Sequence, residues 1–257
     1  MGTIIAIVNQ KGGVGKTTTA INLMAAVSDM GKKCLFVYLD PQANATSGLG
    51  ITKESISHGI YEVLSGTHAP HSAMRSIKGH DFRVIPATES LAGANVELVN
   101  AENREFLLEK ALSPLKEEFE YIFIDCPPSL GLLTINGLVA ADEILIPVQA
   151  EYFALEGLGQ LVSTINLVKE HIKPALSIRG AVITMYDKRY NLSENVLWEL
   201  YQHFPGTIFR TVIPRNVRLA EAPSHGTTIF GYDPSSRGAR AYERLAREFT
   251  NLDQPIS

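Results

Sequence analysis

The run Gln10-Lys11-Gly12-Gly13-Val14-Gly15-Lys16-Thr17-Thr18 is the stretch of this sequence that decides its fold. It follows an apolar segment, Thr3 to Val8, and it opens a helix-like segment that begins at Lys16. Glycines let the backbone curl so that successive N–H groups point at a phosphate, and the helix N-terminus adds partial positive charge. A strand, a glycine-rich turn and a helix in this order predict a phosphate-binding loop.

The side chains of this loop suit a magnesium nucleotide. Lys16 is placed to reach the β- and γ-phosphates, and the Thr17 hydroxyl is placed to bind magnesium. A dinucleotide-binding turn is the alternative, but it needs G-x-G-x-x-G and has no use for two lysines. The loop residues expected to bind nucleotide are Lys11, Gly12, Gly13, Val14, Gly15, Lys16, Thr17 and Thr18.

Outward from the loop, strand-like and helix-like segments alternate along the chain, which predicts a parallel sheet covered by helices. The expected strands are Thr3 to Val8, Lys33 to Leu39, Phe82 to Pro86, Tyr121 to Asp125, Glu143 to Val148, Ser177 to Thr184 and Ile208 to Val212. The expected helices are Lys16 to Met30, Asn103 to Glu118, Leu132 to Ala140, Leu155 to His171, Ser193 to Phe204 and Gly238 to Phe249. We predict an α/β fold with a single doubly wound, mostly parallel sheet, in one domain that covers residues 1–257.

Composition excludes several classes of protein. Of 257 residues, 45% are hydrophobic and 19% charged, as in ordinary globular proteins. No apolar run approaches the roughly 20 residues that cross a bilayer, and Cys34 and Cys126 lack metal-ligand spacing, which indicates reduced thiols in the cytosol. The net charge of −4 argues against a broadly basic surface, but residues 210–247 hold seven arginines and three acids, a local charge of +4.

A second functional motif is the apolar run Tyr121-Ile122-Phe123-Ile124-Asp125, followed by Cys126-Pro127-Pro128. A carboxylate at the C-terminal end of a central parallel strand faces the ligand crevice, where Asp125 can hold magnesium through its water shell. Many strand-terminal aspartates only cap the following loop, which is the alternative here. Beside a phosphate loop, the pattern favours a Walker B carboxylate.

The phosphate loop departs from the usual pattern, G-x-x-x-x-G-K-[ST], because Gln10 stands at its first position. Its form, K-G-G-x-G-K-[ST], resembles that of the deviant Walker ATPases, which include ParA, MinD and the nitrogenase iron protein. The resemblance implies that Lys11 reaches across a dimer interface to the partner's ATP. We therefore expect an ATP-dependent homodimer that sandwiches two nucleotides.

The segment Leu35-Phe36-Val37-Tyr38-Leu39-Asp40-Pro41-Gln42-Ala43-Asn44-Ala45-Thr46 resembles the switch I segment D-x-D-P-Q-x-N-A-T of ParA proteins. The resemblance makes Asp40 a catalytic carboxylate that orients or deprotonates the attacking water. Tyr38 stands where most ParA proteins carry the first Asp; the nitrogenase iron protein also lacks an Asp there, so we expect hydrolysis not to depend on it. The alternative is that Asp40 only begins a turn before Pro41.

The catalytic residues expected from these motifs are Lys11, Lys16 and Asp40, and the magnesium residues are Thr17, Asp40 and Asp125. The motifs supply no strong general base, such as a Glu beside Asp125, so turnover is expected to be slow. ATP would then control shape and choice of partner.

The run Val212-Ile213-Pro214-Arg215-Asn216-Val217-Arg218-Leu219-Ala220-Glu221-Ala222-Pro223-Ser224-His225-Gly226 matches Soj-like ParA proteins closely, as does the run from Leu130 to Asn136. The resemblance, which extends from Ile4 to about Ala246, implies that Met185, Pro214 and Asn216 lie against adenine. It also implies that Arg189 and Arg218 bind DNA without reading sequence. Solvated surface arginines or ion pairs are the alternative for both.

Taken together, the resemblance implies a cytoplasmic, nucleoid-associated ATPase that uses ATP and Mg²⁺ to segregate DNA. Its ATP-bound homodimer would bind double-stranded DNA non-specifically, and a ParB-type centromere-binding protein would stimulate hydrolysis and release the DNA. The loop begins at residue 10, so no N-terminal helix-turn-helix domain is expected.

Three other functions compete with this interpretation. A MinD-like membrane-surface ATPase needs a C-terminal amphipathic helix rich in lysine, whereas residues 244–255 contain acids, a proline and no lysine. An iron–sulfur protein needs two suitably placed cysteines in each subunit, and neither Cys34 nor Cys126 is so placed. An ATP-switched protein scaffold remains open if Tyr38 impairs hydrolysis.

Overall fold

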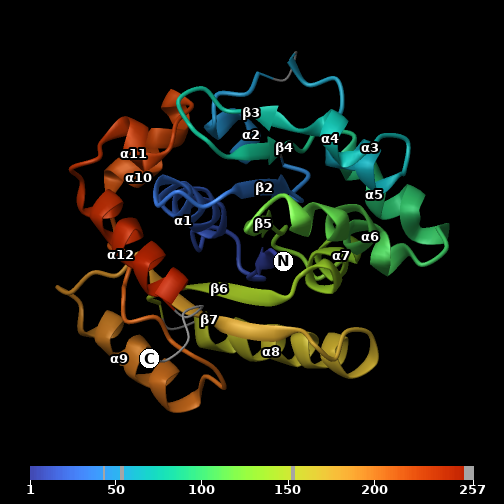
Figure 1. Ribbon diagram of the computed structural model, residues 1–257. Helices are drawn as coiled ribbons and strands as arrows, with labels where there is room; N and C mark the ends of the chain where they lie inside the picture. The colour runs from blue at the N-terminus through green and yellow to red at the C-terminus, as the bar shows by residue number, and fades with distance from the viewer. Residues whose placement is uncertain (43, 53–54, 152–153, 252–257) are drawn as a thin grey trace.

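The computed structural model describes residues 1–257 except 43, 53–54, 152–153 and 252–257. In the described part, seven strands form one sheet in the order β3-β4-β2-β5-β1-β6-β7 (Figure 1). Neighbouring strands are parallel except for β3, which runs antiparallel to β4 at one edge. The strands are β1 (Thr3–Ile7), β2 (Cys34–Tyr38), β3 (Arg75–Ser76), β4 (Arg83–Ile85), β5 (Tyr121–Asp125), β6 (Glu143–Gln149) and β7 (Ser177–Thr184).

The sheet confirms six of the seven expected strands, with β3 as an addition, but the strand expected at Ile208 to Val212 is wrong. Only one bridge, between Ala181 and Ile208, joins that segment to β7. The amides of Arg210 and Thr211 instead donate to the Glu248 carboxylate, at 2.6 and 3.0 Å. A carboxylate from the C-terminal helix thus takes the donors that a strand ladder would need.

The described α-helices are α1 (Lys16–Asp29), α2 (Asn44–Gly48), α3 (Ile60–Leu64), α4 (Pro70–Ala73), α5 (Leu91–Glu97), α6 (Leu107–Leu112), α7 (Leu132–Ala140), α8 (Ala154–His171), α9 (Asn191–His203), α10 (Val217–Glu221), α11 (Ile229–Tyr232) and α12 (Arg237–Asn251). Most expected helices are confirmed, but Asn103 to Glu118 is broken. Two 3-10 segments flank α6, and the second contains Pro114, which lacks the N–H that a continuous helix requires. The unexpected helices have only 4 to 7 residues, too few for a clear periodicity.

Helices cover both faces of the sheet, as expected for a doubly wound α/β fold. Helices α1, α11 and α12 pack together on one face, and α6, α7 and α8 lie on the other (Figure 1). No helix in the described ranges is both long and apolar enough to cross a membrane.

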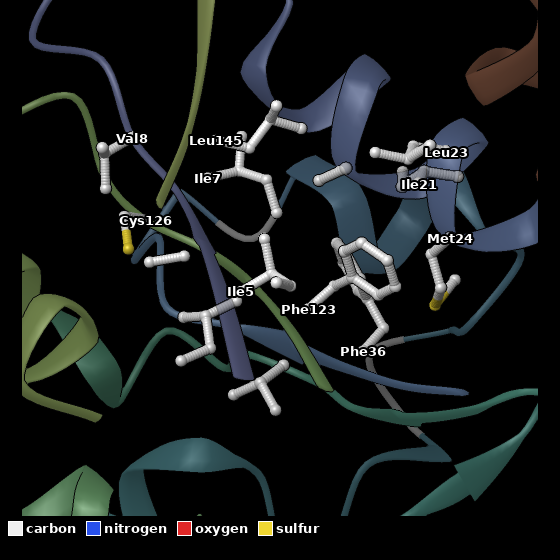
Figure 2. Packing of buried hydrophobic residues seen from close by; sticks show 14 of the residues in the cluster. Ile5, Ile7, Val8, Ile21, Leu23, Met24, Phe36, Phe123, Cys126 and Leu145 are labelled. Carbon is white, nitrogen blue, oxygen red and sulfur yellow. The ribbon is translucent and has the colours of Figure 1, made fainter. Parts of the chain in front are cut away.

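The centre of the core lies between β1 and α1, the two elements that flank the phosphate loop. Figure 2 shows Ile5 and Ile7 of β1 among Phe36, Phe123 and Met24, all of them fully buried. Truncating such a side chain to alanine costs about 2–5 kcal/mol. The loop is therefore anchored at both ends in the buried core.

The sheet topology brings the phosphate loop and Asp125 to the same edge of the sheet. Strand β1 lies between β5 and β6, and the chain continues from β1 to β2 on one side and later to β6 and β7 on the other. In register, Asp125 at the end of β5 stands between Ile7 of β1 and Tyr38 of β2. Ligands of open α/β sheets bind at such a switch point, beyond the carboxyl ends of the strands.

Candidate active site

The glycines of the loop adopt conformations that other residues reach only with strain. Gly13 and Gly15 have φ of 76° and 84°, in the left-handed region. A Cβ on Gly12 or Gly13 would meet nothing within 4 Å, so the loop has an open face there. The carbonyl of Gly15 accepts from the Thr19 amide at 2.8 Å, which starts the hydrogen-bond ladder of α1.

Side chains from two neighbouring strands fix the loop. The Thr184 hydroxyl at the end of β7 donates to the Val14 carbonyl at 2.7 Å. The Asn9 amide donates to the Pro147 carbonyl in β6 at 2.7 Å, while its oxygen accepts from the Lys11 amide at 2.9 Å. The loop is held in shape before any ligand binds.

Thr17 and Asp125 meet under the loop. The Thr17 hydroxyl donates to Oδ2 of Asp125 at 2.7 Å. Asp125 is 1% exposed, and burial raises its pKa to about 7, against the opposing effects of the Thr17 hydrogen bond and the Lys16 charge; Asp40 raises it further. The other oxygen, Oδ1, is buried and has no hydrogen-bond partner within the described residues.

This pair fits a magnesium ion. Hydroxyl and carboxylate oxygens are the hard ligands that Mg²⁺ prefers, and the bare Oδ1 of Asp125 is one that a magnesium-bound water could satisfy. Over the described part of the chain, no group of three His, Cys, Asp or Glu side chains could hold a metal alone. The remaining ligands would come from phosphate and water, as is usual for magnesium in nucleotide sites.

A cavity of about 390 Å³ opens above the loop. It is lined by Gly12, Gly13, Gly15, Lys16, Thr17, Thr18, Ile21, Asn22, Asp40, Gln42, Gly48, Pro128, Met185, Ala222, Pro223 and Thr227. Most of the expected loop residues, Asp40 and Met185 thus face one space. The lining does not include Lys11, Val14, Asp125, Pro214 or Asn216.

Several lining residues escaped the sequence analysis. Asn22 is a polar position within an otherwise apolar helix face, and that signal could have found it. Its amide donates to the Thr18 carbonyl at 2.8 Å and its oxygen accepts from the Ile229 amide at 2.8 Å, so it ties α1 to α11. Ala222 and Pro223 stand in the run that carries Arg218, but no local pattern aims them at the cavity.

Of the three residues expected to lie against adenine, Met185 lines the cavity, whereas Pro214 and Asn216 do not. Met185 follows β7 with φ of 52°, a rare conformation for a residue with a side chain. Its neighbour Tyr186 pairs with Pro214, and this places Pro214 close to the cavity wall. The Asn216 side chain is engaged elsewhere, because its oxygen caps α10 by accepting from the Arg218 amide at 2.8 Å.

The carboxylate of Asp40 lines the cavity and also accepts from the Gln42 amide at 3.0 Å, the contact that the turn alternative predicts. The geometry therefore accommodates a turn and a role in the cavity at once. Tyr38 is buried beside Phe36, with ring centroids 4.4 Å apart in an edge-to-face contact. Burial raises the pKa of the Tyr38 hydroxyl. Ala43 of this segment lies outside the described residues.

The two lysines of the loop have different surroundings. Lys16 is 7% exposed and lines the cavity. The Lys11 side chain is 39% exposed, and its Nζ lies 3.3 Å from Oε2 of Glu151. Glu151 also accepts from the Gln149 amide at 2.7 Å and lies 3.7 Å from Arg215. Lys11 is thus turned away from its own cavity.

Arg189, Arg215 and Arg218 form what we call the arginine surface. Arg189 is 76% exposed and makes a forked contact with Asp187, from Nε at 2.9 Å and NH2 at 2.6 Å. Arg218 is 54% exposed and lies 2.9 Å from Glu221 and 3.5 Å from Asp233. Both arginines are therefore exposed and also engaged in the ion pairs that the alternative interpretation predicts.

A glycine loop after a central parallel strand, a buried lysine and a strand-end aspartate define a P-loop nucleotide-binding protein. The family model for the AAA domain matches residues 2–178. The chain is 52% identical over 248 residues to the sporulation initiation inhibitor protein Soj of Bacillus subtilis, covering 96% of this chain and 98% of that one. It is 50% identical over 257 residues to the chromosome partitioning protein ParA of Myxococcus xanthus, covering 100% and 91%. The chain belongs to the Soj/ParA family of chromosome-partitioning ATPases.

A solved structure with a different name shares the fold. Cobyrinic acid a,c-diamide synthase from Mycobacterium smegmatis, with bound ADP and magnesium, matches with a TM-score of 0.85 and 36% identity, over 96% of this chain and 93% of that one. The same fold therefore holds a magnesium nucleotide in that protein.

Proposed function

We propose that this chain is a slow, magnesium-dependent ATPase whose ATP-bound homodimer holds duplex DNA without reading its sequence. The observation that carries the proposal is the contact between Thr17 and Asp125 under an open glycine loop, with Lys16 buried beside it. We also infer a single ATPase domain across residues 1–257, because the described strands form one sheet around one core.

The phosphates of ATP would lie along the loop, from Lys11 to Thr18, with Lys16 on the β- and γ-phosphates. The adenine would lie toward Met185, Pro214 and Asn216. The cavity above the loop, with Met185 in its wall, supports this orientation. Asn216 would contribute by shaping the start of α10, since its side-chain oxygen is used as a helix cap.

Thr17 and Asp125 would hold magnesium, with Asp40 facing the same cavity. When bound, the ion neutralises charge that develops on the phosphates. The buried, unpartnered Oδ1 of Asp125 supports this role, because an acceptor so placed needs a donor.

Hydrolysis would depend on Asp40 and would be slow. Asp40 is the single carboxylate among the described residues that line the cavity, so it is the candidate for orienting the attacking water. No Glu or His stands beside it in the described lining to act as a stronger general base. Stimulation by a ParB-type protein would then time the release of DNA.

Lys11 would serve the partner's nucleotide. Its side chain is half-exposed and points to Glu151, so it is free to exchange that carboxylate for a phosphate across a dimer interface. Charge-assisted contacts to phosphate are stronger than an exposed ion pair. The dimer would therefore form only with a nucleotide that carries a γ-phosphate.

DNA binding would use Arg189 and Arg218 of both subunits. Exposed arginines on one face supply phosphate contacts, and doubling them in a dimer multiplies the affinity. A MinD-like membrane role is disfavoured, because the apolar residues Leu245, Ala246 and Phe249 of α12 are buried in the core. We propose a cytoplasmic, nucleoid-associated location on the same grounds.

Binding of the purified protein to unrelated duplexes, with ATP, with ADP and without nucleotide, tests the proposal. The expected result is binding with ATP alone, which falls with salt as phosphate neutralisation requires and is lost in Arg218→Ala. Arg104→Ala is the matched control, since Arg104 is also an exposed, ion-paired arginine. If no nucleotide state binds DNA, the partitioning proposal is wrong, and binding to liposomes or to protein partners is tested next.

A further inference from the structure

The arginine surface carries its own carboxylates. Asp187 accepts four hydrogen bonds from Arg189: three from the guanidinium and one, at 3.0 Å, from the backbone amide. These bonds lower the pKa of Asp187 to about 2, so the carboxylate stays charged at every physiological pH. Arg215 adds positive charge beside the same carboxylate.

A second carboxylate cluster surrounds Arg218. Glu221 Oε2 accepts from NH1 of Arg218 at 2.9 Å and from the Tyr232 hydroxyl at 3.0 Å. Asp233 lies 3.5 Å from Nε of Arg218, on another side of the guanidinium. Tyr232 and Asp233 belong to α11 and its C-terminal cap, so the cluster connects two elements. The position of the Arg218 side chain is thus set by its own subunit.

A guanidinium presents the same donors to a carboxylate and to a DNA phosphate. DNA must therefore displace Asp187 and Glu221 before Arg189 and Arg218 can make their best contacts. The guanidinium side of each pair is open to solvent, since Arg189 is 76% and Arg218 54% exposed, although the Asp187 side chain is only 11% exposed. Ion pairs that solvent screens contribute little stability, so displacement is feasible. The displaced carboxylates remain close to the phosphates, however, and repel them.

We propose that Asp187 and Glu221 act as internal competitors of DNA phosphate, which keep the affinity of a single subunit low and make retention on DNA depend on the paired subunits of a dimer. The inference rests on the proposed DNA binding by Arg189 and Arg218. It adds two acidic residues whose removal strengthens binding, whereas most substitutions in a binding surface weaken it.

Isosteric variants separate charge from shape. Asp187→Asn keeps the oxygen that accepts from the Arg189 amide, and Glu221→Gln keeps an acceptor for Tyr232. Glu105→Gln is the matched control, because Glu105 pairs with Arg104 at 2.8 Å and its side chain is partly exposed. All three variants change the net charge by the same amount.

The experiment measures binding of a labelled duplex of unrelated sequence across a range of salt concentrations, with ATP and with ADP. Asp187→Asn and Glu221→Gln are each expected to tighten binding with ATP by about threefold to tenfold, since each acts twice in a dimer. The salt dependence is expected to steepen, because no freed carboxylate takes up a cation to offset those released from DNA. The double variant is expected to bind with ADP as well, so the ratio of the two affinities falls.

Two results would overturn the inference while the proposed function stands: variants that match Glu105→Gln in affinity and salt dependence, or DNA binding that Glu221→Gln restores to Arg218→Ala. The second result would indicate a general charge effect. If the wild-type protein binds DNA in no nucleotide state, the proposed function is wrong and the inference with it. Thermal unfolding of each variant checks that it is folded, and the two carboxylates test the idea independently.

Discussion

The phosphate loop and the arginine surface differ in whether the groups of one subunit are already buried and fixed in place. In the loop, Lys16 is buried, Thr17 is bonded to Asp125, and Thr184 fixes the backbone. On the arginine surface, Arg189 and Arg218 are exposed and held by exchangeable carboxylates. A site with fixed, buried groups binds its ligand within one chain, whereas exposed and neutralised charges depend on number and geometry. One subunit can therefore prepare the nucleotide site, whereas the proposed DNA binding by the arginine surface would need two subunits.

Two glycines outside both regions approach each other closely. Gly50, just after α2, and Gly226, just after the 3-10 helix Ala222–His225, approach so closely that a Cβ on Gly50 would lie 2.9 Å from the Gly226 oxygen. This contact joins the segment that follows Asp40 to the segment that carries Arg218.

The largest expected effect is on ATP binding at the phosphate loop. Lys16→Ala removes the buried ammonium that lines the cavity and is proposed to bind the phosphates, and charge-assisted hydrogen bonds are worth about 1.5–3 kcal/mol each. ATP affinity is expected to fall on the order of 1,000-fold, measured by calorimetric titration. Lys32→Ala, which removes an exposed lysine paired with Glu120, is the control and should bind ATP normally. ATP binding by Lys16→Ala within threefold of wild type would contradict the prediction.

The second prediction tests how strongly burial shifts the pKa of Asp125, which lies under the phosphate loop. Burial raises the pKa of Asp125 to about 7, while an unfolded Asp titrates near 4. Between about pH 4 and pH 7 the folded chain holds a proton that the unfolded chain has lost, so stability falls as pH rises. The stability of Asp125→Asn relative to wild type is expected to increase by about 2–3 kcal/mol from pH 5 to pH 8.

Urea unfolding without nucleotide or magnesium measures this difference. The wild-type and Asp125→Asn curves of stability against pH should diverge through the window and become parallel above about pH 8. Parallel curves throughout would mean that Asp125 titrates as an exposed carboxyl does, and the loop region would then be less completely desolvated than its burial indicates.

A third prediction separates the role of Lys11 from that of the other loop residues. Lys11→Ala is expected to leave ATP affinity of the single subunit within about threefold of wild type, because Lys11 faces Glu151 and not its own cavity. ATP-dependent dimerisation is expected to weaken at least about tenfold, since a charge-assisted contact across the interface is lost. Sedimentation equilibrium with ATP measures the dimer. A variant that dimerises as wild type does would show that Lys11 does not serve the partner.

The smallest expected effect is on stability, at the contact between Gly50 and Gly226. Gly50→Ala and Gly66→Ala both place alanine at φ of 72°, but a Cβ meets the Gly226 oxygen only at Gly50 and nothing within 4 Å at Gly66. The shared strain is about 1 kcal/mol. Gly50→Ala is expected to lose about 1–2 kcal/mol more, from overpacking, in thermal or urea unfolding. Equal losses in the two variants would mean that the contact yields easily.

Local sequence was sufficient to predict the phosphate loop. The segment is contiguous, and left-handed backbone at Gly13 and Gly15 requires glycine wherever such a loop occurs. Asp125 was predictable for a similar reason, because an apolar run that ends in a carboxylate indicates both the strand and the edge where it finishes. Pro114 also carried a local signal, which should have divided the helix expected at Asn103 to Glu118.

The tertiary structure alone decided which distant groups meet. Glu248 takes the amides of Arg210 and Thr211 and so prevents a strand that their local sequence favours. Asp233 approaches Arg218, and Ala222 and Pro223 enter the cavity wall, through packing of α11 against α1 and of α10 against α11. The sequence by itself determined the chemistry of the loop, since backbone conformation there depends on adjacent residues. Only the fold determined the distant partners of the arginines, Asp233 for Arg218 and Glu151 for Arg215, because ion pairs between separate elements depend on how those elements pack.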